Sequence, residues 1–194
     1  MEYEKIIGTG NTAIVYEWGS NKVLKLFHQG YPMEAIIREF KNASLIRDMD
    51  FPKPIAYKVI YCGEQAGIIY DRLDGESLLD WVIKTENAYK CAVYMARLHK
   101  KIIKYSISDV PNYKDFLRRD IERVQDLKER EKALSIIDKL PDGNSLCHGD
   151  YPGNIFIYNE KTAVIDFMNI CHGPFLYDIA RTVFLVQYTP IPEG

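Results

Sequence analysis

The hydrophobic period of the sequence changes twice within its first 74 residues, and no other feature constrains the fold as much. Five short stretches carry the alternating or continuously apolar pattern of strands: residues 3–10, 13–18, 22–27, 55–62 and 66–71. Residues 30–49, between the third and fourth of these, have apolar residues at helical spacing. We therefore expect an antiparallel sheet of five strands with one helix inserted after the third.

After Asp74-Gly75 the pattern becomes mainly helical. Helical spacing is expected over residues 77–84, 87–103, 113–140 and 176–188. One hairpin, residues 154–158 and 162–167, interrupts this pattern. The sequence thus predicts an α+β protein with an N-terminal lobe at residues 1–74 and a mainly helical C-terminal lobe at residues 75–194.

Composition narrows the class of protein. The 194 residues are 47% hydrophobic and 27% charged, an ordinary balance for a globular protein, and the net charge of -2 does not favour nucleic-acid binding. Apolar runs stay well short of the ~20 residues that span a bilayer, and the acidic start "MEYEKIIGTG" is unlike a signal peptide. We expect a cytoplasmic protein with neither nucleic-acid nor membrane partners, while its oligomeric state is left open.

Four cysteines stand at positions 62, 91, 147 and 171 without a CxxC motif, and we expect them to be reduced. Cys147 and Cys171 are each followed by a histidine, so the two pairs could supply four zinc ligands. Structural zinc sites usually take two nearby ligands from each of two knuckles, and this spacing favours small buried thiols instead.

The stretch "GTGNTAIVY" places Gly8, Gly10 and Ala13 in a G-x-G-x-x-A pattern between two expected strands. Small residues let backbone N–H groups approach a phosphate closely. A dinucleotide fingerprint would need a helix next, whereas a strand on both sides is the setting of a kinase Gly-rich loop. Glycine-rich turns are also common in ordinary hairpins, so this motif alone is weak.

Lys25 lies on the strand after this hairpin, where its side chain could reach the phosphates. It would then need an anionic partner, and Glu39 in the inserted helix is the candidate. Glu34 is the alternative, although a carboxylate at a helix start is explained by the helix dipole alone. A lysine on the exposed face of an edge strand is the simpler interpretation of Lys25.

The stretch "HGDYPGN", followed by "VIDF", offers the groups that phosphoryl transfer to a hydroxyl requires. Asp150 could accept the hydroxyl proton, and Asn154 and Asp166 could supply oxygen ligands to Mg²⁺. A turn before a hairpin would explain the Asp, Pro, Gly and Asn of the loop. It would not explain Asp166, because a carboxylate after an apolar strand is costly without a cation or hydrogen bonds.

Taken in order, several segments resemble those of the aminoglycoside phosphotransferase and choline kinase-like family, which shares the protein-kinase fold. The resemblance covers nearly the whole chain and rests on "GTGNTAIVY", "VLKLF", "REF", "IIYDRLDGESL", "ARLH", "HGDYPGN", "VIDF" and "GPFLYDIAR". It implies a kinase-like two-lobe fold and Mg²⁺-dependent transfer of the γ-phosphate of ATP or GTP to a hydroxyl. The acceptor would be a small molecule that the sequence does not identify.

The resemblance also implies a role for each matching residue. Asp150 would be the catalytic base, with Asn154 and Asp166 as Mg²⁺ ligands and a Lys25–Glu39 pair at the phosphates. The nucleotide would further meet the Gly-rich loop and the hinge backbone from Asp71 to Leu73, so its expected contacts are Gly8, Gly10, Ala13, Lys25, Glu39, Asp71 and Leu73. His148 and Asp178 would support the catalytic loop.

Two departures from the family pattern bear on activity. Only "YPG" separates Asp150 from Asn154, where the family has four residues, and the chain ends soon after the helix that carries Asp178, so its C-terminal lobe is expected to be short or truncated. A nucleotide-binding pseudokinase with a regulatory role is therefore the alternative function. A protein kinase fits less well, because "HGD" replaces "HRD", "DFM" replaces "DFG" and no "APE" follows.

Overall fold

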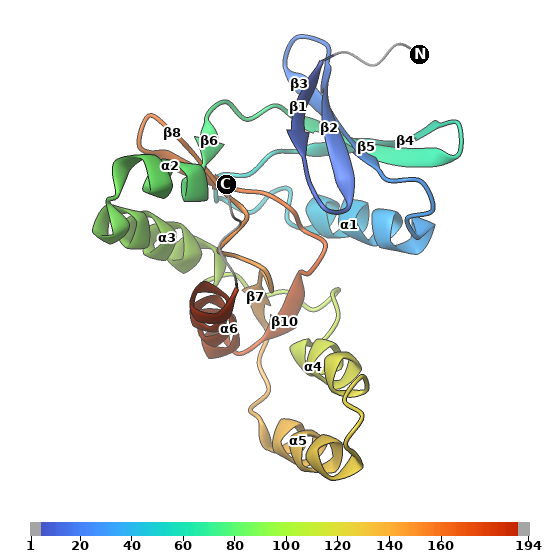
Figure 1. Cartoon of the computed structure of the whole chain (residues 1–194), viewed down its shortest axis with the longest axis vertical. Helices are drawn as coiled ribbons and strands as arrows, with labels where there is room; N and C mark the ends of the chain where they lie inside the picture. Colours follow the sequence, from blue (N-terminus) through green and yellow to red (C-terminus); the bar gives the residue numbers. More distant parts are fainter. Residues whose placement is uncertain (1–4, 190–194) are drawn as a thin grey trace. The chain divides into compact units, whose positions relative to one another are not determined.

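The computed structural model describes residues 5–189 and shows a mixed α+β protein (Figure 1). The chain divides into two compact units. The first unit comprises Met1–Tyr94 with Asn154–Met168, and the second comprises Met95–Gly153 with Asn169–Gly194. The division into lobes at residues 1–74 and 75–194 stays a prediction.

The first unit contains the predicted sheet. Its strands are β1 (Ile6–Thr9), β2 (Ala13–Trp18), β3 (Lys22–Phe27), β4 (Ala56–Cys62) and β5 (Gln65–Asp71). They lie in the order β1-β2-β3-β5-β4, and every neighbouring pair is antiparallel. Helix α1 (Met33–Leu45) connects β3 to β4, which confirms the expected five strands with one inserted helix.

The register of β3 and β5 separates the two faces of this sheet. Lys25 pairs with Ile68 and Val23 pairs with Tyr70, so Lys25 and Tyr70 project from the same face. The other face carries a buried apolar cluster of Leu24, Leu26 and Ile69. The alternation of the strands thus places Lys25 and Tyr70 on one face and this apolar cluster on the other.

A second, smaller sheet completes the first unit. It has the order β6-β8-β9, with β6 (Glu76–Ser77), β8 (Ile155–Tyr158) and β9 (Lys161–Val164). Helix α2 (Leu78–Thr85) follows β6, and α3 (Ala88–Ile102) runs from the first unit into the second. The Val164 N–H donates to the Pro52 carbonyl at 3.0 Å, which ties the β8–β9 hairpin to the segment before β4.

The second unit is mainly helical. It holds α4 (Tyr113–Ile121), α5 (Leu127–Lys139) and α6 (Phe175–Tyr188), with two short strands, β7 (Ser145–Cys147) and β10 (Cys171–Gly173). The single helix expected over residues 113–140 is wrong. The Asp126 side chain accepts from the N–H groups of Lys128 and Glu129, so it caps the start of a separate helix.

Strands β7 and β10 were not expected from the sequence. They pair antiparallel, with Cys147 directly opposite Cys171, and both thiols are buried. Within residues 5–189, no group of three or more His, Cys, Asp and Glu side chains could hold a metal ion. The two Cys-His pairs therefore meet as neighbouring strands and do not form a four-ligand zinc cluster.

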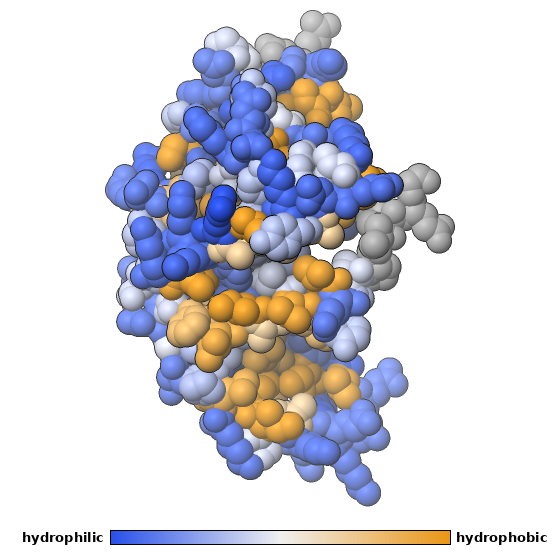
Figure 2. All heavy atoms as spheres, turned by 90° about the vertical axis from the view of Figure 1, so that its left-hand side faces the viewer, coloured by the Kyte–Doolittle hydropathy of each residue, from blue (hydrophilic) through white to orange (hydrophobic). Residues whose placement is uncertain are grey.

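Helix α6 exposes much of its apolar surface. Its large exposed apolar side chains are Phe175, Leu176, Ile179, Val183, Phe184, Val186 and Tyr188. Figure 2 shows an apolar band across the middle of its view, at the height where Figure 1 draws α6. The residue of this helix that is buried is not apolar but acidic, Asp178. No helix in residues 5–189 is long and apolar enough to cross a membrane.

Candidate active site

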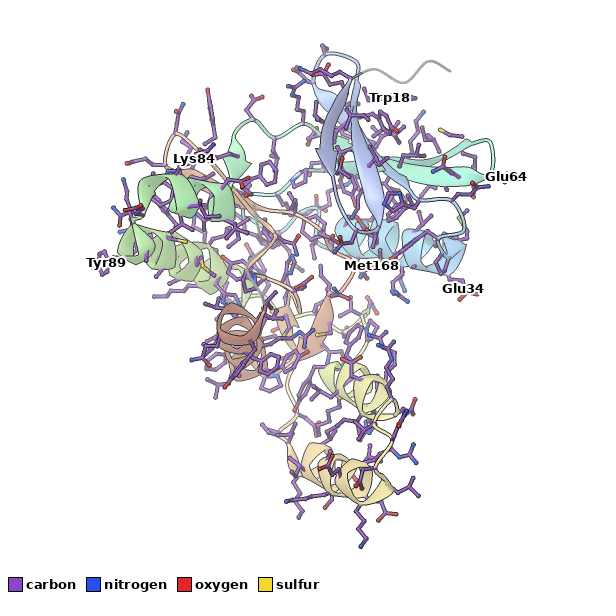
Figure 3. All side chains as sticks on the ribbon, viewed as in Figure 1. Trp18, Glu34, Glu64, Lys84, Tyr89 and Met168 are labelled. Atoms are coloured by element: carbon purple, nitrogen blue, oxygen red, sulfur yellow. The ribbon has the colours of Figure 1, made fainter. Side chains whose placement is uncertain are left out.

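A buried ion pair lies between the sheet and α1. Nζ of Lys25 donates to Oε1 and Oε2 of Glu39 at 2.8 and 2.9 Å, and it lies 3.4 Å from Oδ2 of Asp166. The Lys25 side chain is only 14% exposed and that of Glu39 only 1%. Lys25 is therefore not an exposed lysine of an edge strand, and Glu39 is its partner. Figure 3 shows Glu34 at the far end of α1 from Met168, the second residue after Asp166.

The sequence around Glu39 explains its position. The buried face of α1 consists of Ala35, Ile36, Glu39, Asn42 and Ala43, which follow one another at steps of one, three, three and one. Two polar residues thus occupy a face that an ordinary amphipathic helix would fill with apolar side chains. Buried polar groups need hydrogen-bond partners. Here Glu39 accepts from Lys25, and Asn42 donates to the carbonyl of Phe167, the residue after Asp166.

The electrostatics of the pair follow from burial and from a second carboxylate. Burial raises the pKa of Glu39, and Asp166 raises it further, against the opposing effect of Lys25. Burial alone would lower the pKa of Lys25, but Glu39 and Asp166 outweigh it, so the pKa of Lys25 is raised. The Lys25 ammonium thus lies between the carboxylates of Glu39 and Asp166, and it remains a cation.

Asp166 adopts a conformation that L-residues rarely take. Its φ is 62°, in the left-handed region, where strain in a non-glycine residue often accompanies function. The Ile165 N–H donates to the Asn154 carbonyl at 2.9 Å, which extends the β8–β9 ladder by one step. Asn154 and Asp166 therefore lie at the same open end of one hairpin. The Asp166 carboxylate, one third exposed, and the Asn154 amide are hard oxygen donors of the kind Mg²⁺ prefers.

Helix α1 also holds the segment that follows Asp166. Nδ2 of Asn42 donates to the Phe167 carbonyl at 2.8 Å, and the Arg38 guanidinium lies 3.9 Å from Sδ of Met168. Figure 3 shows Met168 next to α1. Sequence reasoning missed Asn42, although its place three residues after Glu39 on the same helix face was a usable signal.

The Gly-rich stretch forms the tight β1–β2 hairpin. The Gly10 N–H donates to the Ala13 carbonyl at 2.9 Å, and Gly8 pairs with Val15 across the two strands. Ala13 is buried opposite Phe27. These three small residues keep the hairpin narrow. Because the Gly10 N–H already donates within the turn, this hairpin has fewer N–H groups to donate to an anion than the motif alone suggests.

The predicted hinge is fixed at its first residue. The Asp71 carboxylate accepts from the Ile55 N–H at 3.0 Å and from Oη of Tyr57 at 2.6 Å. Leu73, half-buried, lies in the irregular segment that connects β5 to β6. Asp71 thus anchors the end of β5, and residues 72–74 leave the sheet from a defined point.

In the second unit, the first residues of "HGDYPGN" are held by Asp178. Its carboxylate accepts from the N–H groups of His148 and Gly149, each at 2.9 Å, and from Nε2 of His99 at 2.8 Å. Burial works to raise the pKa of Asp178, but these hydrogen bonds hold it below its usual range. The Arg181 side chain donates to the Gly149 carbonyl. Asp150 is the next residue, so its backbone follows directly from this fixed point.

Tyr151, on the other side of Asp150, is anchored as well. Its ring is buried and stacks on His99 with centroids 4.3 Å apart, and its hydroxyl donates to the Met95 carbonyl at 2.8 Å. Sequence reasoning missed this anchor, because a tyrosine in a turn carries no signal that it will pack against a helix so distant in the sequence. Both neighbours of Asp150 are therefore held by α3 and α6.

The structure sorts the predicted site residues into the two units. The first unit holds Gly8, Gly10, Ala13, Lys25, Glu39, Asp71, Leu73, Asn154 and Asp166, and the second holds Asp150. Within the first unit, Lys25, Glu39 and Asp166 come together in one cluster.

This arrangement can be compared with known proteins. The profile of the phosphotransferase enzyme family, APH, matches residues 6–193. The chain belongs to this family. A methylthioribose kinase from Geobacillus sp. (strain WCH70) is 38% identical over 73 residues, which make up 36% of this chain. The chain thus covers only 18% of the length of that curated relative.

Solved structures of other family members share the fold. An aminoglycoside phosphotransferase APH(4)-Ia, in a ternary complex with AMP-PNP and hygromycin B, superimposes with a TM-score of 0.70 at 18% identity, over 95% of this chain and 72% of that one. APH(3'')-Id from Streptomyces rimosus ATCC10970, in complex with ADP and streptomycin, gives 0.65 at 14% identity, over 91% and 76%. The fold is therefore the protein-kinase-like fold of the aminoglycoside phosphotransferases.

Proposed function

We propose that this phosphotransferase-family chain binds ATP or GTP with Mg²⁺ and transfers the γ-phosphate to a hydroxyl of a small molecule. The observation that carries the proposal is the Lys25–Glu39 pair with Asp166 beside it. A buried cation that is held by one carboxylate and lies 3.4 Å from a second is costly for a structural core. It is the arrangement expected of a site that binds phosphate and a divalent cation.

In this proposal Lys25 binds phosphate oxygens of the nucleotide. Its ammonium is a compact charge with three donors, two of which serve Glu39. The remaining donor faces Asp166 in the ligand-free chain and turns to a phosphate when nucleotide binds. Gly8, Gly10 and Ala13 keep the hairpin above the phosphates free of bulk, and the backbone from Asp71 to Leu73 receives the base.

Asp166 and Asn154 are the residues that would hold Mg²⁺, since they supply a carboxylate and an amide oxygen from one end of the β8–β9 hairpin. A bound Mg²⁺ would supply positive charge that offsets the negative charge developing on the transferred phosphate. Oδ2 of Asp166 lies 3.4 Å from Nζ of Lys25, so the two groups would act on the same phosphates.

Asp150 orients the acceptor hydroxyl and takes its proton as the hydroxyl oxygen bonds to the γ-phosphorus. The bond from that phosphorus to the β-phosphate oxygen breaks, and the nucleoside diphosphate leaves. The contacts of Asp178 and Tyr151 fix the residues on either side of Asp150. Positioning of this kind supplies much of the rate in phosphoryl transfer.

A regulatory pseudokinase is the second candidate. The observation that favours it is the loop of three residues between Asp150 and Asn154, one fewer than the family pattern. A misplacement of ~1 Å can cost ~100-fold in rate. Nucleotide binding depends on Lys25 and Asp166 and would survive such a loss.

The test is calorimetric titration of the chain with ATP and with GTP, each with and without Mg²⁺, followed by an assay of phosphate transfer to a panel of hydroxylated small molecules. Metal-dependent binding with transfer supports the phosphotransferase. Metal-dependent binding with neither transfer nor nucleotide hydrolysis supports the regulatory protein. Failure to bind either nucleotide contradicts both.

A further inference from the structure

We propose that Tyr70 is a positioning residue, whose hydroxyl holds the Glu39 carboxylate so that Lys25 is presented to the nucleotide phosphates. The inference rests on the nucleotide binding proposed above. Its observation is a hydrogen bond of 2.9 Å from Oη of Tyr70 to Oε1 of Glu39, between two buried side chains. The motif "IIYDRLDGESL" contains Tyr70, but no role was predicted for this residue from the sequence.

The hydroxyl acts on the same oxygen as the lysine. Oε1 of Glu39 accepts from Lys25 at 2.8 Å and from Tyr70 at 2.9 Å, while Oε2 accepts from Lys25 alone at 2.9 Å. Three hydrogen bonds from two different strands thus fix both oxygens. With Lys25 alone, the carboxylate and the ammonium could rotate together as a unit, but Tyr70 ties the pair to the sheet.

The strand register explains how Tyr70 reaches this position. Tyr70 lies two residues after Ile68, the partner of Lys25 across the β3–β5 ladder, so both side chains leave the sheet on the face that α1 covers. The backbone of Tyr70 is held by pairing with Val23 and by the neighbouring Asp71, which accepts from the Ile55 N–H. The hydroxyl is therefore presented from a rigid strand.

A fixed Glu39 is important because a second carboxylate competes for the lysine. Lys25 lies 3.4 Å from Asp166 and 2.8 Å from Glu39. If Glu39 turned away, Lys25 would lose its nearest anion and move toward Asp166, the proposed Mg²⁺ ligand. Because Tyr70 holds Glu39 from a second strand, Lys25 stays beside Glu39 and does not move toward Asp166.

A simpler role is that Glu39 only satisfies the buried tyrosine hydroxyl, as buried tyrosines require. The two roles differ in what a phenylalanine does. In the simpler role, Tyr70→Phe alters stability and leaves nucleotide affinity unchanged. In the positioning role, it weakens affinity, and it does so only while Glu39 is present.

The experiment is a double-mutant cycle on the affinity for ATP and GTP with Mg²⁺, using Tyr70→Phe, Glu39→Leu and both together. We expect Tyr70→Phe to weaken binding about five- to tenfold in the wild-type chain. It should have no further effect in the Glu39→Leu chain, because Tyr70 acts through Glu39. An unchanged affinity in Tyr70→Phe, or an equal loss in both backgrounds, overturns the proposal.

A spectroscopic measurement makes the test independent of nucleotide binding. The carboxyl ¹³C signal of Glu39 in the ligand-free chain should move in Tyr70→Phe and stay in place in Tyr113→Phe, the matched control. Tyr113 is also buried, and its hydroxyl donates to the Pro141 carbonyl at 2.5 Å. A wild-type chain that binds no nucleotide would refute the proposed function, whereas an unmoved Glu39 signal would refute the role of Tyr70.

If Tyr70→Phe does not fold, 3-fluorotyrosine placed at position 70 gives the same information. It keeps the ring and the hydroxyl, and fluorine makes the hydroxyl more acidic and hence a stronger donor. The Glu39 signal should then move while those of exposed glutamates such as Glu34 stay in place. A Glu39 signal that stays in place would overturn the proposal.

Discussion

Nε2 of His99 lies 2.8 Å from Oδ2 of Asp178, and both side chains are buried. The same carboxylate accepts the N–H groups of His148 and Gly149. Helix α3, helix α6 and the start of the "HGDYPGN" loop are thus joined at one anion. The backbone that leads into Asp150 depends on this anion, although Asp178 is 28 residues away in the sequence.

Replacing Asp178 by asparagine should destabilise the chain strongly. The amide cannot accept on both sides as the carboxylate does, so at least one buried donor loses its partner, and the charge that strengthens the others is removed. We expect the free energy of unfolding to fall by about 3 kcal/mol in urea denaturation. The control is Asp138→Asn, which removes an exposed ion pair with Arg118 and should change stability by less than about 1 kcal/mol. Equal effects of the two substitutions would contradict the role given to Asp178.

The pH dependence of stability gives a second test of this anion. Hydrogen bonds outweigh burial and hold the pKa of Asp178 below its ordinary value of 3.8. The stability that this ionised group contributes is complete above that ordinary value, and it is lost as the pH falls through the lower pKa of the folded state. The stability difference between the wild type and Asp178→Asn should therefore shrink in acid. Urea midpoints measured between about pH 7 and pH 3 would show it, and parallel curves would refute it.

The glycine of the same loop should not tolerate a side chain. Gly149 has a φ of 77°, and a Cβ there would clash with the Asn169 carbonyl oxygen. Gly149→Ala should therefore lose about 1–3 kcal/mol of stability through backbone strain, and more through the clash. Gly153 is the matched control, because a Cβ at that position would meet no described heavy atom within 4 Å. Thermal unfolding should show a clear loss for Gly149→Ala and little change for Gly153→Ala.

The parts of the fold and site that local patterns determine could be predicted. Strand alternation and the helical spacing of residues 30–49 are local properties, and they gave the five-stranded sheet with α1 inserted. Glu39 could be chosen as the partner of Lys25 because the other carboxylate, Glu34, is explained by the helix dipole. Lys25 itself stood out as a charged residue in an otherwise apolar strand. Asp166 stood out for the same reason, since a carboxylate directly after an apolar strand requires a partner.

Contacts between distant segments could not be predicted. The stacking of Tyr151 on His99 and the hydrogen bond from Tyr70 to Glu39 join residues 52 and 31 positions apart, and no local pattern encodes them. Strands β7 and β10 are three residues each, too short to show a period. The break between α4 and α5 was missed because the apolar spacing continues past Ile121. The Asp126 side chain nevertheless caps a new helix, so the chain forms two helices there.

The Lys25–Glu39 pair should behave as a strongly coupled unit. Lys25→Met leaves the Glu39 carboxylate buried without its cation, and we expect it to cost about 3–5 kcal/mol of stability. Lys25→Met combined with Glu39→Leu should cost clearly less than the sum of the single changes, because neither charge is then left unpaired. A cycle of urea denaturation measurements gives the coupling, and additive costs would show that the pair is not coupled.

Asp166→Asn isolates the proposed metal ligand with little change to the backbone. Asparagine tolerates the left-handed region, so a φ of 62° is preserved while the negative charge is removed. We expect Mg²⁺ to strengthen nucleotide binding in the wild type and to have little effect in the variant. Metal-free binding should be unchanged or slightly tighter in the variant, because one anion facing the phosphates is gone. Calorimetric titrations with and without Mg²⁺ measure both effects, with the exposed Asp109→Asn as the control. A variant that retains the full Mg²⁺ effect would remove Asp166 from the metal site and leave Asn154 as its only predicted protein ligand.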